Sequence, residues 1–284
     1  MTQPILTISD MSIVFSSPDE ADIEAVRQVD LTLTPGKTLA LVGESGCGKS
    51  VTARAVLRLL DRNADIPRGS ILFQPEGEAA TDIAQLKQDS LPLRAIRGNQ
   101  ISMIFQEPMS SLSPVHTIGD QIDEMMILHE GLKPKQARER TVALLDQVGI
   151  PGARQRAEAY PFELSGGLRQ RAMIAMALAC TPQLLIADEP TTALDVTTQA
   201  QILDLLRQLQ ADFGMAMLFI THDLGVVAEI ADEVAVMYLG DVVEQGSRDE
   251  VFSNPQHAYT RALFAATPRA DVESIKARLA RRAA

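Results

Sequence analysis

The chain has little of what a disulfide-bonded or membrane-spanning protein needs. Only two cysteines, Cys47 and Cys180, occur in 284 residues, so a disulfide framework is excluded and a reducing cytoplasm is expected. The longest apolar run, residues 172–180, is far shorter than the roughly 18 to 20 residues that span a bilayer. The first residues, MTQPILTISDMSIVF, lack the basic and apolar regions of a secretory signal. We therefore expect a chain that is soluble by itself and meets a membrane only through a partner.

Positive charge is also scarce. Lysine and arginine number 26 against 37 aspartates and glutamates, which gives a net charge of −11. A protein that grips a phosphate backbone over a broad face carries a basic surface, so nucleic acid is not expected as a partner. With 46% hydrophobic and 22% charged residues, the composition is that of an ordinary globular protein with a buried core.

Short apolar runs alternate with stretches of helical periodicity along most of the chain. This alternation is typical of an α/β protein with a mainly parallel core sheet covered on both faces. Two N-terminal segments alternate in polarity and predict an antiparallel β-subdomain, and Gly240-Asp241 between two apolar runs predicts a hairpin. The runs of strand length are residues 38–42, 101–105, 184–187 and 217–220, and the alternating segments are residues 5–15 and 24–33.

The remaining segments predict an insertion and a tail. From about residue 90 to about 180 the pattern changes to helical repeats punctuated by prolines, which predicts a helical insertion subdomain within a single domain of residues 1–268. Residues 269–284 carry five basic and two acidic side chains at a spacing compatible with a helix. This basic tail is either a solvated terminal helix or a surface that docks on a partner or on lipid headgroups.

A phosphate-binding loop is predicted at residues 43–50. The segment matches G-x-x-x-x-G-K-[ST] at every fixed position, and it stands between an apolar strand and a helical run, residues 50–60. Its glycines let backbone N–H groups wrap the phosphates, Lys49 adds a point charge, and the Ser50 hydroxyl can ligate Mg²⁺. The predicted nucleotide-binding residues here are Gly43, Glu44, Ser45, Gly46, Cys47, Gly48, Lys49, Ser50 and Val51.

Cys47 lies inside this loop, close to the expected start of a helix. Thiol pKa values tend to fall at helix N-termini, so we expect a lowered pKa for Cys47. Alkylation of this thiol is expected to inactivate the protein, and ATP is expected to protect it.

Two carboxylates follow a second apolar strand, in the sequence LLIADE of residues 184–189. They come at the carboxyl end of a strand, where ligands of open α/β folds bind. Asp188 is placed to hold Mg²⁺, directly or through water, and Glu189 to orient and polarise an attacking water. Together with the phosphate loop, this pair predicts an ATP-hydrolysing site.

An octet shortly before the acidic strand carries a family resemblance. Residues 164–171, LSGGLRQR, resemble the signature motif of ATP-binding cassette (ABC) ATPases. The other family motifs are present in order: the phosphate loop, the acidic strand, ALD at 193–195 and THD at 221–223. The resemblance implies a P-loop NTPase in which Ser165, Gly166 and Gly167 of one chain contact the γ-phosphate held by the other chain. The family usually has glutamine at the position of Leu168.

The same resemblance assigns four further residues. It implies that His222 holds the γ-phosphate and the attacking water, and that Gln106 touches Mg²⁺ or this water. Asp195 would cross the dimer interface. Phe15 is the candidate for the aromatic that stacks on adenine, with a plain core position as the alternative. The expected catalytic residues are Glu189, His222, Gln106 and Lys49, and the expected magnesium ligands are Ser50, Gln106 and Asp188.

Two segments resemble one branch of the family, the oligopeptide and dipeptide importers. They are IFQEPMSSLSP at 104–114 and NPQHAYTRAL at 254–263. The branch also serves nickel, oligosaccharide and opine-type importers, so the transported solute stays open. Relatives often continue into a cysteine cluster that can hold an iron–sulfur centre. Because no cysteine follows Cys180, we expect no such cluster.

The resemblance implies a peripheral subunit on the cytoplasmic face of the inner (plasma) membrane. The expected partners are a second ATPase subunit, in a homodimer or a heterodimer, two integral membrane permease subunits and, indirectly, an extracytoplasmic solute-binding protein. Two other classes remain as alternatives: a cassette ATPase that remodels nucleic acid, and a regulatory module that binds ATP without turnover. Copurification with integral membrane proteins distinguishes the first class from both.

Overall fold

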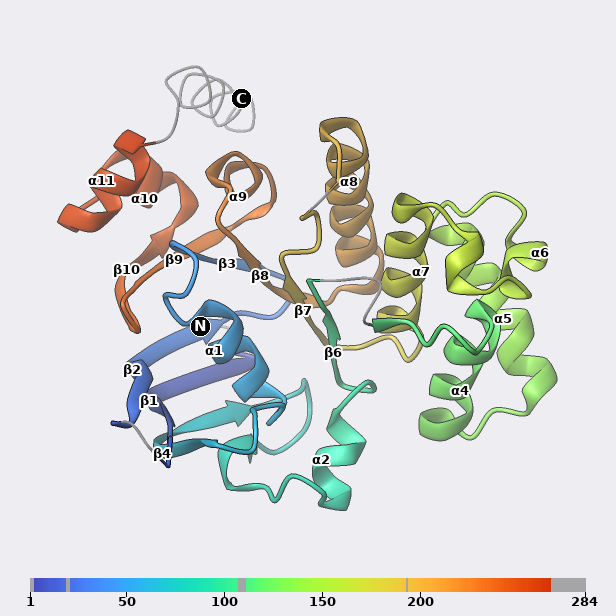
Figure 1. Cartoon of the computed structure of the whole chain (residues 1–284), viewed down its shortest axis with the longest axis horizontal. Coiled ribbons are helices and arrows are strands. Elements are labelled where there is room, and N and C mark those ends of the chain that lie inside the picture. The colour runs from blue at the N-terminus through green and yellow to red at the C-terminus, as the bar shows by residue number, and fades with distance from the viewer. Residues whose placement is uncertain (1–2, 19–20, 107–110, 193, 267–284) are drawn as a thin grey trace. The chain divides into compact units, whose positions relative to one another are not determined.

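A computed structural model describes residues 3–18, 21–106, 111–192 and 194–266. The chain divides into two compact units: unit 1 comprises residues 1–88 and 216–284, and unit 2 comprises residues 89–215. Figure 1 labels most of the elements of both. The basic tail at 269–284, residues 107–110 of the importer-type segment, and Ala193 of the ALD motif lie outside the described residues.

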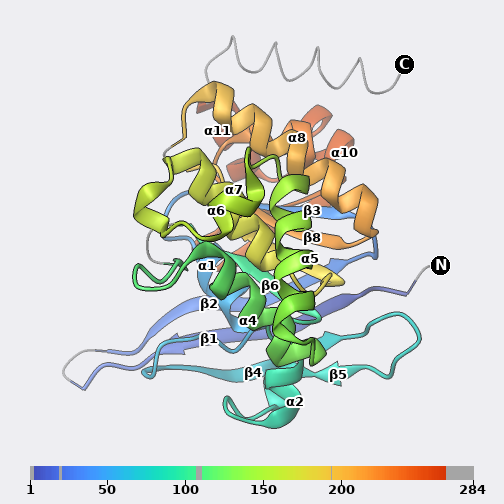
Figure 2. The ribbon, with the colours of Figure 1, turned by 90° about the vertical axis from the view of Figure 1, so that its right-hand side faces the viewer.

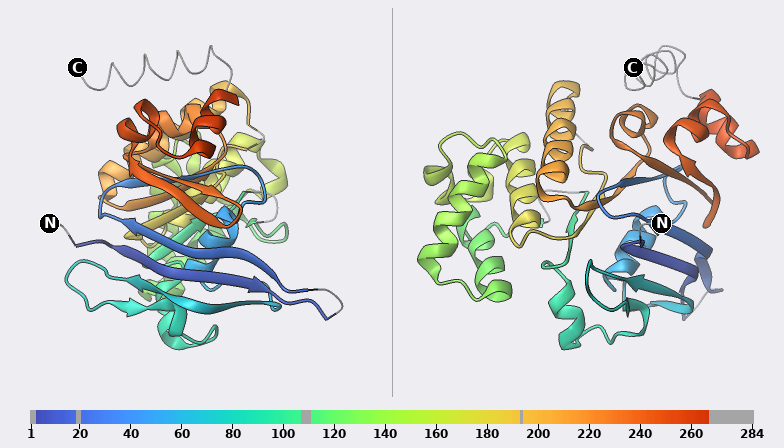
Figure 3. Two further views of the ribbon diagram at one scale, coloured as in Figure 1. Left: turned by 90° about the vertical axis from the view of Figure 1, so that its left-hand side faces the viewer. Right: turned by 180° about the vertical axis from the view of Figure 1, so that it is seen from behind.

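Unit 1 contains an antiparallel sheet with the strand order β2-β1-β4-β5. Its strands are β1 (Leu6–Phe15), β2 (Ile23–Leu33), β4 (Ala64–Phe73) and β5 (Thr81–Asp82). Figure 2 shows these strands side by side, and the left view of Figure 3 shows the long β1 and β2 from the other side. The antiparallel sheet predicted from the N-terminal alternation is confirmed, and β4 and β5 extend it beyond the two predicted segments.

The second sheet segment of unit 1 has the order β10-β9-β3-β8. Strand β3 (Thr38–Val42) runs parallel to both β8 (Ala216–Thr221) and β9 (Glu233–Tyr238), while β10 (Asp241–Ser247) is antiparallel to β9. Every residue of β3 and β8 is buried, which explains their continuous apolar sequences. The predicted parallel strands are therefore confirmed in this unit.

The predicted hairpin is confirmed, but its turn lies one residue earlier than Gly240-Asp241. Tyr238 pairs with Asp241, so the two turn residues are Leu239 and Gly240. Their φ angles are 48° and 92°, the left-handed conformation that a tight two-residue hairpin turn requires at both positions. Glycine adopts it without strain, and the strand pairing imposes it on the leucine.

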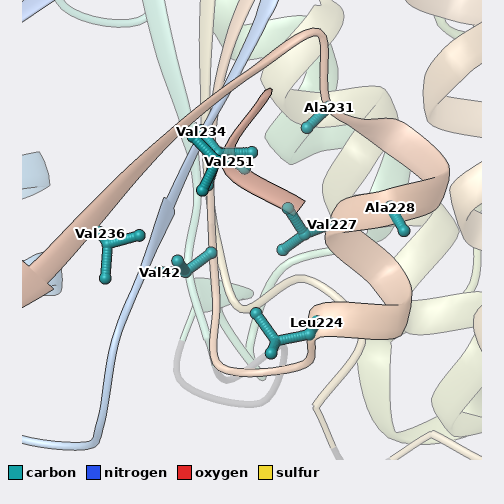
Figure 4. Packing of buried hydrophobic residues seen from close by; sticks show 9 residues of the cluster. Val42, Leu224, Val227, Ala228, Ala231, Val234, Val236 and Val251 are labelled. Carbon is teal, nitrogen blue, oxygen red and sulfur yellow. The ribbon is translucent and has the colours of Figure 1, made fainter. Parts of the chain in front are cut away.

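The helices of unit 1 pack on strands of both of its sheets. They are α1 (Lys49–Val56), η1 (Ile83–Gln85), α9 (Leu224–Ile230), α10 (Arg248–Ser253) and α11 (Ala258–Ala266). Figure 4 shows Leu224 and Val227 of α9 beside Val42 of β3 in a buried cluster. Helix α1 ends at Val56, before the predicted residue 60, because Arg58 adopts φ 52°. The N–H groups of Arg58 and Leu59 donate to carbonyl oxygens of the last helical turn and so terminate the helix.

Unit 2 contains a parallel strand pair and a group of helices. The strands are β6 (Ile101–Ile104) and β7 (Leu184–Asp188), as predicted. The helices are α2 (Leu91–Ile96), α4 (Ile118–Glu130), α5 (Pro134–Gln147), α6 (Ala153–Ala157), η2 (Pro161–Glu163), α7 (Gly166–Leu178) and α8 (Val196–Phe213). The right view of Figure 3 shows α4 to α7 grouped together. Buried Asp123 of α4 accepts hydrogen bonds from Thr141 and Arg138 of α5 and so joins these two helices.

Candidate active site

The phosphate loop connects β3 to α1 in unit 1, as predicted. Gly46 and Gly48 have φ angles of 80° and 109°, and Gly43 has 153°. A Cβ atom on Gly43 would lie 2.2 Å from the carbonyl oxygen of Met237, and one on Gly48 would lie 2.7 Å from that of Ala25. Glycine is therefore needed at both positions, because β2 and β9 approach the loop backbone directly.

Lys49 is the first residue of α1 and is only 5% exposed. Its Nζ donates to the carbonyl oxygens of Gly43 and Glu44, both at 2.8 Å, and lies 3.7 Å from Sγ of Cys47. The two carbonyls satisfy donors of the ammonium but carry no formal charge. A buried cation held in this way is suited to an anionic ligand.

The start of α1 also fits a phosphate and a magnesium ion. The helix begins after Gly48 with no side-chain cap and no acidic residue in its first turn, so the positive end of its dipole faces the loop. Ser50 and Val51 follow in this turn and are half-buried. The oxygen donors predicted for magnesium, Ser50, Gln106 and Asp188, are the hard ligands that this ion prefers.

The expectation of a lowered pKa for Cys47 is wrong. The side chain is 5% exposed, and burial raises the pKa of its thiol above the ordinary value of 9.0. The charge and hydrogen bond of Lys49 act in the opposite direction without reversing the shift. Desolvation of the thiolate therefore outweighs the helix N-terminus.

Glu189 follows β7 in unit 2, and two side chains hold its carboxylate. Gln106 Nε2 donates to Glu189 Oε2 at 3.1 Å, and Thr192 Oγ1 donates to the same oxygen at 2.8 Å. Glu189 itself adopts φ 46°, a conformation that costs a non-glycine residue energy. The neighbouring Asp188 ends the strand and is 1% exposed. The structure thus brings together two predicted residues, Gln106 and Glu189, within unit 2.

The signature octet forms the start of α7, which begins at Gly166. Ser165 is the N-cap, and its hydroxyl accepts a hydrogen bond from the N–H of Leu168 at 3.4 Å. Ser165 and Gly166 are exposed, and Gly167 and Leu168 are half-buried. An exposed helix N-terminus favours an anion, and the role of Ser165, Gly166 and Gly167 at the phosphate of another chain stays a prediction.

Asp195 caps the next helix, α8. Its carboxylate accepts hydrogen bonds from the N–H groups of Thr197 and Thr198, both at 3.0 Å, and from the Thr198 hydroxyl at 2.6 Å. The bonds from Thr198 hold the pKa of Asp195 below its usual value. Asp195 therefore has a local structural role, and its predicted role at a dimer interface stays a prediction.

His222 and Phe15 belong to unit 1. His222 is exposed and follows β8 directly, and its neighbour Asp223 caps α9 by accepting from the N–H groups of Gly225 and Val226. Phe15 is the last residue of β1 and is half-buried, outside the buried core. The nucleotide roles of both residues stay predictions.

Comparison with known proteins identifies the family. Residues 26–192 match the family model of ABC transporters, and residues 243–283 match the C-terminal region of oligopeptide/dipeptide transporters. The chain belongs to the ABC transporter family. Among the described residues of this ABC protein, no helix has both the length and the apolar character needed to cross a membrane.

Relatives named for solute uptake are close in sequence to the ABC protein. A Brucella ovis relative, whose name describes an ATP-binding protein of peptide import, is 56% identical over 268 residues, covering 94% of this chain and 78% of its own. The peptidoglycan transport ATP-binding protein of Agrobacterium fabrum is 55% identical over 271 residues, or 95% of this chain and 48% of its own. The glutathione import ATP-binding protein of Escherichia coli is 50% identical over 265 residues, or 93% and 42%.

Solved structures confirm the P-loop NTPase fold of the ABC protein. A dimeric ATP-binding cassette in a post-hydrolysis state, bound to ADP and Pi, superposes with a TM-score of 0.73 at 25% identity and covers 85% of this chain and 98% of its own. A component of an ABC transporter complex of Clostridium perfringens gives 0.72 at 26% identity, with 94% and 97% covered. The ABC protein is the ATP-hydrolysing subunit of a transporter.

Sequence reasoning missed two residues near the predicted site. Thr192 has no motif of its own, and the only signal is a hydroxyl three residues after Glu189. Tyr259 lies in the segment 254–263 that suggested the importer branch, yet nothing in that segment showed that its hydroxyl accepts a hydrogen bond from the N–H of Glu44 at 3.3 Å. Both contacts depend on the folded chain.

Proposed function

We propose that this ABC protein drives the uptake of peptides or a related small solute. The match of residues 243–283 to the oligopeptide/dipeptide transporter region supports the branch. The names of relatives, which describe peptide, peptidoglycan and glutathione transport, favour peptide-like solutes over nickel, oligosaccharides and opines. The subunit would work at the cytoplasmic face of the plasma membrane with two permease subunits and, through them, a solute-binding protein.

The observation that carries the hydrolytic role is the fixed carboxylate of Glu189. Two donors, Gln106 and Thr192, hold one of its oxygens. Because these hydrogen bonds already fix the orientation of the carboxylate, no further side-chain entropy is lost when the reaction occurs. We assign it the proton of the attacking water, the task of a general base. Gln106 orients the same water through its amide, and His222 holds the transferred phosphate.

The loop residues 43–51 bind the phosphates of ATP through backbone N–H groups and through the ammonium of Lys49. Ser50, Asp188 and Gln106 would hold Mg²⁺, which when bound neutralises phosphate charge. Phe15 is assigned to the adenine ring. The loop and the carboxylates at the end of β7 would act on the same nucleotide. Separate variants of the loop and of the carboxylates test this.

The exposed signature helix supports a dimer. Ser165 and Gly166 lie at the surface of unit 2 with a serine-capped helix N-terminus, and we propose that they complete the phosphate site of a second ATPase subunit. That subunit is either a copy of this chain or a different ATPase. Such an arrangement leaves each chain with only part of a working site, which couples hydrolysis to subunit closure.

Uptake by a reconstituted complex tests the proposed function. The tagged chain is purified from its own membranes in mild detergent, and the copurifying proteins are inserted into liposomes with ATP on the side of this chain. We expect labelled di- and oligopeptides to accumulate, and we expect no accumulation with Lys49→Ala. Purification without integral membrane proteins, or equal uptake with both forms, would contradict the proposal.

A further inference from the structure

The C-terminal helices of unit 1 are firmly attached to its core. Tyr259, Leu263 and Phe264 of α11 pack against the buried cluster that contains Val42 and Val227, drawn in part in Figure 4. The rings of Phe252 on α10 and Phe264 stack with their centroids 4.9 Å apart. Because this cluster also includes Val42, the last residue of β3, α11 packs against the same buried cluster as the strand that leads into the phosphate loop.

The segment just before α11 is held from β10 by Glu244. Its two carboxylate oxygens accept hydrogen bonds from the backbone N–H groups of Gln256, at 2.7 Å, and His257, at 2.9 Å. The N–H of Tyr259 donates in turn to Nδ1 of His257 at 3.2 Å. The position of Tyr259 is therefore set by a chain of hydrogen bonds that begins at Glu244.

Tyr259 reaches the phosphate loop from this position. Its ring stacks on that of Tyr238, with centroids 4.0 Å apart and 28° between the planes, and its hydroxyl accepts from the N–H of Glu44 at 3.3 Å. Beyond Tyr238, the N–H of Gly240 in the hairpin turn donates to the carbonyl of Cys47 at 3.1 Å. Burial raises the pKa of Tyr259, so its hydroxyl is neutral at pH 7.

Glu44 connects Tyr259 to Lys49. The N–H of Glu44 is bonded to Tyr259, while its carbonyl oxygen accepts from Nζ of Lys49 at 2.8 Å and from the N–H of Cys47 at 3.3 Å. A shift of this residue would therefore move an acceptor of the buried ammonium. The Tyr259 hydroxyl therefore binds the backbone N–H of Glu44, and the Lys49 ammonium binds the carbonyl oxygen of the same residue.

We propose that Tyr259 is a positioning residue for the phosphate loop, through which the C-terminal segment sets the affinity for ATP. The inference rests on the proposed binding of ATP at this loop. Tyr259 acts without touching the nucleotide: it fixes the position of the Glu44 backbone and thereby the position of the Lys49 ammonium. Stacking of its ring on Tyr238 serves packing, and the hydroxyl alone carries the positioning role.

Two matched variants separate these roles. Tyr259→Phe keeps both rings and removes the hydroxyl that meets Glu44, whereas Tyr238→Phe removes the hydroxyl of the other ring. Loss of one neutral hydrogen bond corresponds to about a 2- to 10-fold change in affinity. For Tyr259→Phe we expect the Kd and KM for ATP to rise by that factor, with kcat and the melting temperature of the ATP-free protein little changed. For Tyr238→Phe we expect no change.

A third variant reaches the loop without altering either ring. Glu244→Ala releases the two residues just before α11, Gln256 and His257. We expect it to raise the Kd for ATP like Tyr259→Phe, with little further increase in the double variant. An unchanged Kd in Tyr259→Phe would overturn the inference. So would an equal rise in Tyr238→Phe, or a fall in kcat and melting temperature without a change in Kd.

Lys49→Ala distinguishes failure of the inference from failure of the proposed function. We expect this variant to lose ATP binding. If it does and Tyr259→Phe binds ATP like the unaltered protein, only the positioning role is wrong. If Lys49→Ala binds ATP normally, the loop is not the nucleotide site, and both proposals fail.

Discussion

The side-chain amide of Gln106 donates a hydrogen bond to Oε2 of Glu189 over 3.1 Å, although 83 positions separate the two residues. The pairing of β6 with β7 makes this possible, because both strands run parallel and place these residues just beyond their carboxyl ends. The hydrogen bond joins two residues that were predicted to act at the attacking water: Glu189 to orient and polarise it, and Gln106, by the family resemblance, to touch it or Mg²⁺.

Thr192 supplies the second donor to the Glu189 carboxylate, so its hydroxyl is expected to affect turnover. Thr192→Val keeps the shape and removes the donor, and kcat should fall about 2- to 10-fold, the value of one hydrogen bond, while KM for ATP stays the same. Thr192→Ser should restore the rate. Steady-state kinetics measure both, and a valine variant with normal kcat would show that Glu189 needs no help from Thr192.

Gly43 and Gly46 provide a matched pair of substitutions in the phosphate loop. A Cβ on Gly43 would meet the backbone of Met237 at 2.2 Å, whereas one on Gly46 would meet nothing within 4 Å. Gly46→Ala should therefore cost about 1 kcal/mol of unfolding free energy through its positive φ alone. Gly43→Ala should cost about 3 kcal/mol or more through overpacking. Denaturant unfolding without nucleotide measures the two, and equal losses would contradict the close approach of β9.

Both cysteines should react slowly with alkylating reagents at neutral pH. Burial raises the pKa of Cys47 above 9.0 and that of Cys180 to about 11, and the thiolate is the reactive form. The thiolate fraction falls tenfold for each pH unit below the pKa, so at pH 8 Cys180 is ionised to roughly 0.1%. We expect iodoacetamide to label both cysteines more slowly than it labels glutathione, at a rate that rises with pH. Slow alkylation of Cys47 is still expected to inactivate the protein, and ATP is expected to protect this thiol.

Mass spectrometry of each cysteine as a function of pH measures this. The same chain in urea is the control, since unfolding removes the burial and should bring both thiols to ordinary rates. Labelling of folded Cys47 faster than glutathione at pH 7 would show that the helix N-terminus, and not burial, controls its pKa.

Strands with a continuous apolar run or a regular alternation could be predicted from the sequence, and β4 could not. Strand β3 is a continuous apolar run between two polar segments, and it is buried at every residue. Strand β4 contains Pro67 and Gly69 and buries only Ile71 and Phe73 near its end, so it has neither a long apolar run nor a regular alternation. Its place in the sheet comes from pairing with β1, which no local pattern encodes.

The candidate site shows the same division. The phosphate loop and the acidic strand are each contiguous, so their residues could be predicted from local spacing, and the contiguous signature octet could be predicted from its resemblance to the family motif. The contact of Tyr259 with Glu44 joins residues 215 positions apart, and nothing in either local sequence predicts it. The pKa of Cys47 was predicted with the wrong sign because the helix N-terminus is visible in the sequence and the depth of burial is not.

The central claim is that the protein hydrolyses ATP with Glu189 as the base. The most direct test measures the rate of ATP hydrolysis and the oligomeric mass of the purified protein in the presence of Mg²⁺ and ATP, for the unaltered chain and for Glu189→Gln. The glutamine keeps the size of the side chain and cannot accept the proton. We predict that hydrolysis falls by a factor of about 10² or more while ATP binding persists and an ATP-bound dimer accumulates. Unchanged turnover in Glu189→Gln would contradict the assignment.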